Sequence, residues 1–268
     1  MIDWTKTKIL AIAGLAGAGK TQWLREQLKE QDANVAYFAP QTDNCPVDRY
    51  CLGIEFPNWQ FIAEGEELKL IEAGQKGAIA VIELGFYVAP ESGEQLLTLL
   101  QSEGFSCQRI AFVSDQMANS PWHAWANEVV EVDMPLPSRN LEVWRSPMGG
   151  QVFDPESLNI FWEELTQGAY GDIQRAKGVV EIVDGRAFYL DYVSHSPETL
   201  YKDLKIEPWL NGRPERFSGL EVVGSKLDGK QIADTIVDCC LDNELLDYYQ
   251  AQIRQQMQQQ QSQGAPVY

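Results

Sequence analysis

The sequence lacks both a long apolar run and an excess of positive charge. No segment approaches the roughly 20 uninterrupted apolar residues that a membrane helix needs. The 39 acidic side chains outnumber the 21 basic ones, which gives a net charge of -18. Such a surface repels phosphodiester backbones and anionic lipid at long range. We therefore expect neither nucleic acid nor a membrane among the partners of the protein.

Metal-binding side chains are also scarce. There are 5 cysteines and 2 histidines in 268 residues. Cys45 and Cys51 are too far apart for a C-x-x-C zinc pair, and only His123 and His195 could complete a ligand set. An odd number of cysteines favours reduced thiols and a cytoplasmic location. The residues themselves therefore predict no transition-metal site and no structural disulfide.

Short apolar runs alternate with helical stretches through the first half of the chain. This pattern is typical of strand–helix units that build a parallel sheet. The runs occupy residues 8–14, 34–39, 59–63, 77–84, 108–114 and 127–133. Residues 21–31 and 91–104 carry apolar residues at helical spacing. We predict an α/β domain with a mainly parallel sheet flanked by helices.

Three prolines and two glycines between residues 134 and 150 predict a break in regular structure there. The first domain is therefore expected over 1–150, and a smaller α+β domain over 151–250. Within the second domain, Asp184-Gly185 predicts a hairpin turn and residues 217–240 a last strand followed by a helix. The glutamine-rich residues 251–268 are predicted to be a frayed helix end and disorder.

One segment matches the phosphate-loop pattern G-x-x-x-x-G-K-[ST], also called Walker A, without a substitution. It comprises Gly14, Leu15, Ala16, Gly17, Ala18, Gly19, Lys20 and Thr21. The segment follows an apolar strand and opens an amphipathic helix, as phosphate binding requires. In this reading the glycines turn backbone N–H groups around the phosphates. Lys20 then meets the β and γ oxygens, and the hydroxyl of Thr21 binds magnesium. The alternative is a small-residue turn with a solvated lysine.

A phosphate-loop enzyme also needs a carboxylate at the end of a neighbouring strand to hold magnesium or order water. Glu83, which closes an apolar run, fits that place best. Asp115 and Asp133 follow strands in the same manner, although either could instead cap a following helix or turn. Asp43 and Asp48 lie in the loop after the second strand, where a switch segment or a solvated acidic loop is expected.

Several segments together resemble the CobW family of P-loop GTPases. They are the phosphate loop, Glu83-Leu84-Gly85 followed by "FYVAP", and the later "GDIQRAKGVVEI", "SGLEVVGSKLD" and "IVDCC". The family's C-terminal domain opens with G-x-x-x-R-x-K-G and ends with a "VxG" strand and a helix that closes on cysteine. The corresponding positions here are Gly171, Arg175, Lys177, Gly178, Val223, Gly224 and Cys239 or Cys240.

The resemblance implies a GTP-binding hydrolase related to metallochaperones, with Lys20 at phosphate, Thr21 at magnesium and Glu83 as the acidic residue of a switch. By resemblance alone, zinc or cobalt would be the delivered metal. Three departures qualify this: glycine follows Glu83 after two residues instead of three, the family's C-x-C-C motif is missing, and no Asn-Lys-x-Asp guanine element occurs. The base, GTP or ATP, therefore stays open.

The sequence thus predicts magnesium-dependent nucleotide binding, with GTP foremost, and slow hydrolysis that controls a client protein in metal homeostasis. An adaptor that binds nucleotide without hydrolysing it is the alternative. A small-molecule kinase is less favoured, because no arginine cluster offers a basic lid. Arg175 and Lys177 are expected to contact a partner or the nucleotide domain, or else to be ordinary strand charges. The sequence does not predict the oligomeric state.

Overall fold

The computed structural model describes residues 8–29, 34–88, 90–136, 140–196 and 199–262. The chain divides into two compact units, Met1–Ser138 and Arg139–Tyr268. Each unit has its own sheet and its own buried core. None of the helices in these ranges is long and apolar enough to cross a membrane.

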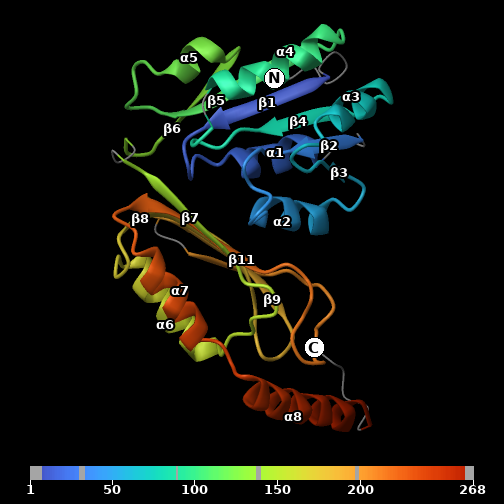
Figure 1. Cartoon of the computed structure of the whole chain (residues 1–268), viewed down its shortest axis with the longest axis vertical. Coiled ribbons are helices and arrows are strands. Elements are labelled where there is room, and N and C mark those ends of the chain that lie inside the picture. Colours follow the sequence, from blue (N-terminus) through green and yellow to red (C-terminus); the bar gives the residue numbers. More distant parts are fainter. Residues whose placement is uncertain (1–7, 30–33, 89, 137–139, 197–198, 263–268) are drawn as a thin grey trace. The chain divides into compact units, whose positions relative to one another are not determined.

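The first unit is built on a six-stranded parallel sheet (Figure 1). Its strands are β1 (Ile9–Gly14), β2 (Val35–Phe38), β3 (Gln60–Phe61), β4 (Ile79–Glu83), β5 (Cys107–Ser114) and β6 (Glu128–Val132). Their order across the sheet is β3-β2-β4-β1-β5-β6. Five of these strands lie within predicted apolar runs, and β5 begins one residue before its run, at Cys107. The agreement arises because a parallel strand covered on both faces needs apolar side chains at nearly every position. The predicted α/β fold is confirmed.

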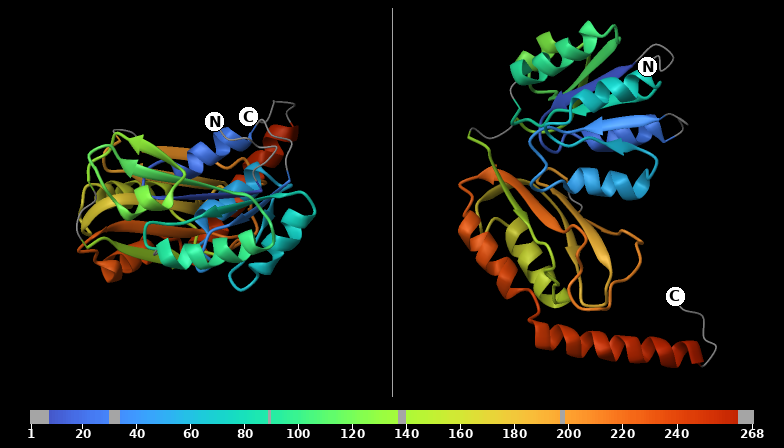
Figure 2. Two further views of the ribbon diagram at one scale, coloured as in Figure 1. Left: turned by 90° about the horizontal axis from the view of Figure 1, so that it is seen from above. Right: turned by 45° about the vertical axis from the view of Figure 1, so that its right-hand side comes forward.

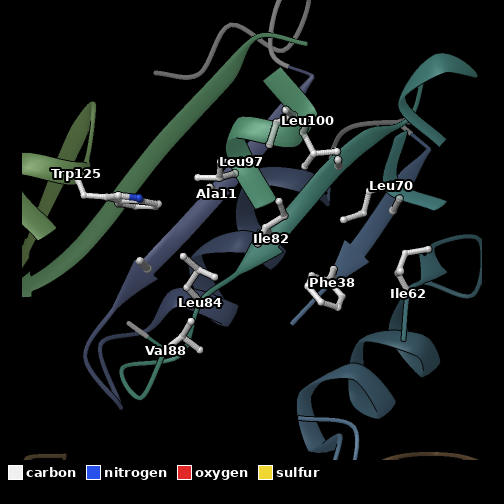
Figure 3. Packing of buried hydrophobic residues seen from close by; sticks show 14 of the residues in the cluster. Ala11, Phe38, Ile62, Leu70, Ile82, Leu84, Val88, Leu97, Leu100 and Trp125 are labelled. Carbon is white, nitrogen blue, oxygen red and sulfur yellow. The ribbon is translucent and has the colours of Figure 1, made fainter. Parts of the chain in front are cut away.

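Helices cover both faces of this sheet. They are α1 (Lys20–Leu28), α2 (Val47–Glu55), α3 (Leu68–Gln75), α4 (Pro90–Ser102) and α5 (Pro121–Trp125). Apolar residues of α1 and α2 pack with one alternating set of strand residues, and those of α3, α4 and α5 pack with the other. Figure 3 shows the second core, where Leu97 and Leu100 of α4 lie over Ala11 and Ile82. Helices α2 and α3 were not predicted, since both are short and α2 replaces part of an expected loop.

The second unit has a five-stranded antiparallel sheet with helices α6 and α7 on one face (Figure 2). Its elements are β7 (Glu142–Pro147), α6 (Pro155–Thr166), β8 (Asp172–Glu181), β9 (Ala187–Val193), β10 (Leu200–Asp203), β11 (Gly219–Ser225), α7 (Gly229–Asp238) and α8 (Asn243–Ser262). The strand order is β10-β9-β8-β11-β7. The predicted hairpin at Asp184-Gly185 connects β8 to β9, with Gly185 at φ 84°.

The expected boundary near residue 150 was misplaced. Residues 142–147 were assigned to a break in regular structure, but they form β7, which pairs with β11 along its whole length. This strand therefore belongs to the second sheet, and the division falls between Ser138 and Arg139. Of the proline and glycine residues that suggested a break, Pro147 is the last residue of the strand and the others are outside it, so none interrupts the ladder.

The prediction of disorder after residue 250 was wrong for residues 251–262, which continue helix α8. Gln250 anchors this helix: its side chain is buried and bonds to the backbone of Trp209 and Gly212. Ile253 and Met257 follow on the same side and are half-buried. Glutamine is also a good helix former, so the tail needs little more to stay helical. Residues 263–268, also in that prediction, lie outside the described residues.

Two glycines of the C-terminal motif allow β8 and β11 to meet closely. A Cβ atom on Gly224 would collide with the carbonyl oxygen of Asp172. Gly171 has φ 129°, and a Cβ there would lie 2.8 Å from the carbonyl oxygen of Lys226. The register of the two strands shifts between Val223 and Gly224, at this same place. Both glycines are therefore required by backbone packing.

Replacing Gly224 with alanine is expected to lower the free energy of unfolding by about 2 kcal/mol, because the new methyl group must displace backbone. Denaturant unfolding of the full chain measures this change. Gly149→Ala is the matched control, since nothing lies within 4 Å of the Cβ position at Gly149. Equal stability of the two variants would contradict the close-approach explanation.

Candidate functional site

The glycine loop connects β1 to α1, and its first residue is fixed by a close backbone contact. Gly14 has φ 135°, and a Cβ atom there would run into the carbonyl oxygen of Phe112. The N–H of Leu15 donates to that same oxygen at 3.2 Å. Gly17 and Gly19 have φ 76° and 80°, in the left-handed region. The loop conformation thus depends on glycine at all three positions.

The loop delivers Lys20 to the first position of α1. The Nζ atom of Lys20 donates to the carbonyl oxygens of Gly14 at 3.1 Å and Leu15 at 2.8 Å, so the ammonium group lies against the loop's own backbone. Gly19 caps the helix without a side-chain hydrogen bond, and the first turn holds no acidic residue. The positive end of the helix dipole and the lysine therefore favour an anion at the loop.

Glu83 lies beside the loop because β4 is the direct neighbour of β1. The register pairs Ile12 with Glu83, so the last residue of β4 sits where β1 is about to enter the loop. The carboxylate is largely buried, at 8% exposure. Its Oε1 atom accepts a hydrogen bond from the Thr21 hydroxyl at 2.8 Å. The structure thus brings together Lys20, Thr21 and Glu83, the three side chains expected to carry the chemistry.

Tyr37 is a member of this site that the sequence analysis missed. Its hydroxyl donates to the Oε2 atom of Glu83 at 2.9 Å, and its side chain is fully buried. Burial raises the pKa of Tyr37 well above its ordinary value, and the negative charges of Glu83 and Asp48 add to the effect. The signal in the sequence was weak, namely one hydroxyl-bearing residue inside an otherwise apolar strand.

The rival carboxylates lie elsewhere. Asp115 and Asp133 follow strands as predicted, but both are exposed. Asp43 accepts hydrogen bonds from Arg49 at 2.7 Å and from the Glu64 backbone at 2.8 Å, and so ties its own loop together. Asp48 is in the first turn of α2 and acts on Tyr37 electrostatically. Of these carboxylates, Glu83 is the one that is both buried and bonded to the loop.

The structure adds no support for a transition-metal site. Among the residues that it describes, no group of three or more His, Cys, Asp and Glu side chains could hold a metal ion. Cys45 and Cys51 are buried thiols that form no disulfide. Cys239 and Cys240 are also outside any disulfide, and burial raises the pKa of Cys240 to about 12. Such thiols pack as small apolar groups and are weak ligands.

The charged residues of the C-terminal motif form ion pairs within their own sheet. Arg175 forms a bidentate ion pair with Asp191 and also donates a hydrogen bond to the Tyr192 carbonyl at 2.9 Å. Lys177 bonds to the buried carboxylate of Glu221 at 2.9 Å. These contacts give both residues a structural role inside the second unit.

The raised pKa of Tyr37 predicts a loss of stability in alkali. Below pH about 10 the phenol is protonated in both states. Above that value the unfolded chain releases the proton first, so the free energy of unfolding falls by about 1.4 kcal/mol per pH unit until the folded pKa is passed. Tyr37→Phe lacks this contribution, and unfolding curves at pH 9 and pH 10.5 should show a smaller loss than wild type. Equal losses would contradict the prediction.

The second unit matches a known family. Residues 148–240 match the model of the cobalamin synthesis protein cobW C-terminal domain. This range contains every residue of the C-terminal pattern noted in the sequence, from Gly171 to Cys240. No curated protein matches the chain significantly.

Two solved structures show a distant likeness along most of the chain. The Zn(II)-bound YjiA GTPase from E. coli is 13% identical, with 87% of this chain and 98% of that chain covered, at a TM-score of 0.31. A Zn(II)-bound triple mutant of YjiA gives the same identity, TM-score and share of this chain, with 99% of its own chain covered. A likeness at this TM-score carries no argument about function. The second unit is therefore similar to the cobW C-terminal domain over residues 148–240.

Proposed function

We propose that the first unit binds a nucleoside triphosphate, with GTP as the foremost candidate, together with magnesium, and hydrolyses it slowly. One observation carries the proposal: the Thr21 hydroxyl and the Glu83 carboxylate lie 2.8 Å apart beside a glycine loop that also presents Lys20. An ordinary turn has no need for this combination of an uncapped helix start, a buried lysine and a buried acid.

Phosphate binding would rest on the loop from Gly14 to Thr21. The left-handed glycines allow backbone N–H groups to turn inward, and α1 adds its positive N-terminus. Lys20 would exchange its contacts with loop carbonyls for the β and γ oxygens. Because Lys20 is only 9% exposed, its charge is poorly screened and acts strongly on a bound anion.

The donor set at the loop fits magnesium. Thr21 offers a hydroxyl and Glu83 a carboxylate, and hard oxygen ligands of this kind are the ones that Mg²⁺ prefers. The Thr21 O–H donates to Glu83 Oε1, so its lone pairs are free to face a cation. When bound, magnesium neutralises charge on the β and γ phosphates. Glu83 would orient water of the magnesium shell or the attacking water.

Slow turnover is expected because we assign no arginine to the transferred phosphate, and such an arginine contributes much of the rate in fast members of this enzyme class. The bound state would then last long enough to control a client protein. The similarity to the cobW C-terminal domain supports a client in metal handling, with zinc or cobalt as the metal that the family resemblance implies.

A second candidate function is that of an adaptor that binds nucleotide without hydrolysing it. It is favoured by the missing guanine element and the missing C-x-C-C motif. Phosphate release over several turnovers, abolished in Lys20→Ala, would exclude this candidate.

Lys20→Ala is expected to weaken nucleotide binding in the presence of magnesium by at least about 100-fold, because a buried charge-assisted contact to phosphate is lost. Titration with fluorescent GTP and ATP analogues measures the affinity and identifies the preferred base. Lys76→Ala, which removes an exposed lysine of the same unit, is the control and should bind as wild type does. Equal affinities of the two variants would refute the phosphate-site assignment.

Glu83→Gln is expected to lower the rate of phosphate release by about tenfold or more. The reason is that an amide does not accept a proton from water and has no negative charge to balance that of magnesium. Single-turnover hydrolysis at saturating nucleotide tests this. Glu72→Gln alters an exposed glutamate on α3 and should leave the rate unchanged. A Glu83→Gln rate equal to that of wild type would remove Glu83 from the mechanism.

A further inference from the structure

The carboxylate of Glu83 is held from two sides by hydroxyl groups on different elements. Thr21 on α1 donates to Oε1 at 2.8 Å, and Tyr37 on β2 donates to Oε2 at 2.9 Å. Two donors on one carboxyl group suit its ionised form, which only accepts hydrogen bonds. Oε1 therefore points toward Thr21 at the glycine loop, and Oε2 points toward Tyr37 in the sheet interior.

Sheet geometry fixes the direction of Tyr37. Strand β2 pairs with β4 so that Tyr37 lies opposite Val81, and Glu83 is two residues further along the same face of β4. The tyrosine ring packs edge-on against Phe61, with 5.8 Å between the ring centroids. A fully buried ring in this position has little freedom to swing its hydroxyl away from the carboxylate.

We propose that Tyr37 is a positioning residue for the magnesium carboxylate. By binding Oε2, its hydroxyl prevents Glu83 from rotating and keeps Oε1 directed at Thr21 and the cation that Thr21 would ligate. This inference rests on the proposed function, because it concerns the same carboxylate. In this proposal, Tyr37 contributes to the affinity for magnesium although it would touch neither the metal nor the nucleotide.

The place of Tyr37 in the chain gives the contact a further consequence. The residue is in β2, whose last residue, Phe38, precedes the loop at residues 39–46 that leads into α2. The carboxylate that would sense magnesium is therefore bonded directly to the strand that carries this loop. Further along the chain from this strand, Asp43 and Arg49 form an ion pair.

The test is a magnesium titration of nucleotide binding in Tyr37→Phe. This change keeps the buried ring and removes only the hydroxyl. Nucleotide affinity in excess chelator should stay within about twofold of wild type, because the loop and Lys20 are untouched. The magnesium concentration for half-maximal enhancement of binding should rise by about tenfold, as is typical when an outer-shell partner is removed. A general loss of structure would weaken both quantities together.

Tyr189→Phe is a matched control. Tyr189 is also buried and also donates to a carboxylate, Asp191 at 2.7 Å, but in the second unit. Its removal should leave the magnesium requirement unchanged. In addition, Tyr37→Phe introduced into Glu83→Gln should cause no further change in that requirement, since the proposed effect acts through the Glu83 carboxylate.

The outcomes separate the two proposals. If wild-type protein binds no nucleotide, or binds it without regard to magnesium, the proposed function fails. If wild type depends on magnesium and Tyr37→Phe has the same requirement, the inference about Tyr37 is overturned and the proposed function stands. Should Tyr37→Phe fold poorly, NMR of wild type with ¹³C-labelled tyrosine Cζ gives a second test. A tyrosine resonance that moves with magnesium supports the inference, and none moving overturns it.

Discussion

The hydrogen-bonded carboxylate of Glu83 is the interaction on which the first unit's chemistry depends. It joins three elements that are separate in sequence: the start of α1 through Thr21, the end of β4, and the middle of β2 through Tyr37. Because the carboxylate is buried, losing either hydrogen bond would cost free energy, since a charged group without partners is unfavourable inside a protein. The loop geometry, the helix start and the sheet order all serve to bring these groups to one point.

The sheet order explains why this meeting is possible. Because β4 is inserted between β1 and β2, the end of β4 faces the phosphate-loop pattern on one side and Tyr37 on the other. A parallel sheet places the carboxyl ends of its strands at one edge, where ligands of such folds bind. The second unit is held together differently. Its antiparallel strands approach closely at Gly171 and Gly224, and its buried charged side chains form ion pairs with one another.

Much of the fold was predictable from the sequence because the apolar runs and the glycine loop are strong local signals. Each of the six parallel strands coincides with a predicted run to within one residue. The predicted loop connects β1 to α1, and Thr21 lies beside Glu83 at the end of β4. Strand β7 was missed because nearby proline and glycine residues resemble a linker, whereas its pairing with β11 is a long-range property. The length of helix α8 was underestimated, as a frayed helix end, because its anchor, Gln250, depends on a loop distant in sequence. Tyr37 could not be assigned from sequence, since only the register of β2 with β4 brings it to Glu83.

Hydrogen–deuterium exchange of the wild-type chain, with and without GTP and magnesium, tests the central claim most directly. We expect slower exchange in peptides that cover residues 14–21 and 79–85, and slower exchange with magnesium than with chelator at equal nucleotide occupancy. Protection confined to other segments, or none at saturating nucleotide, would contradict it.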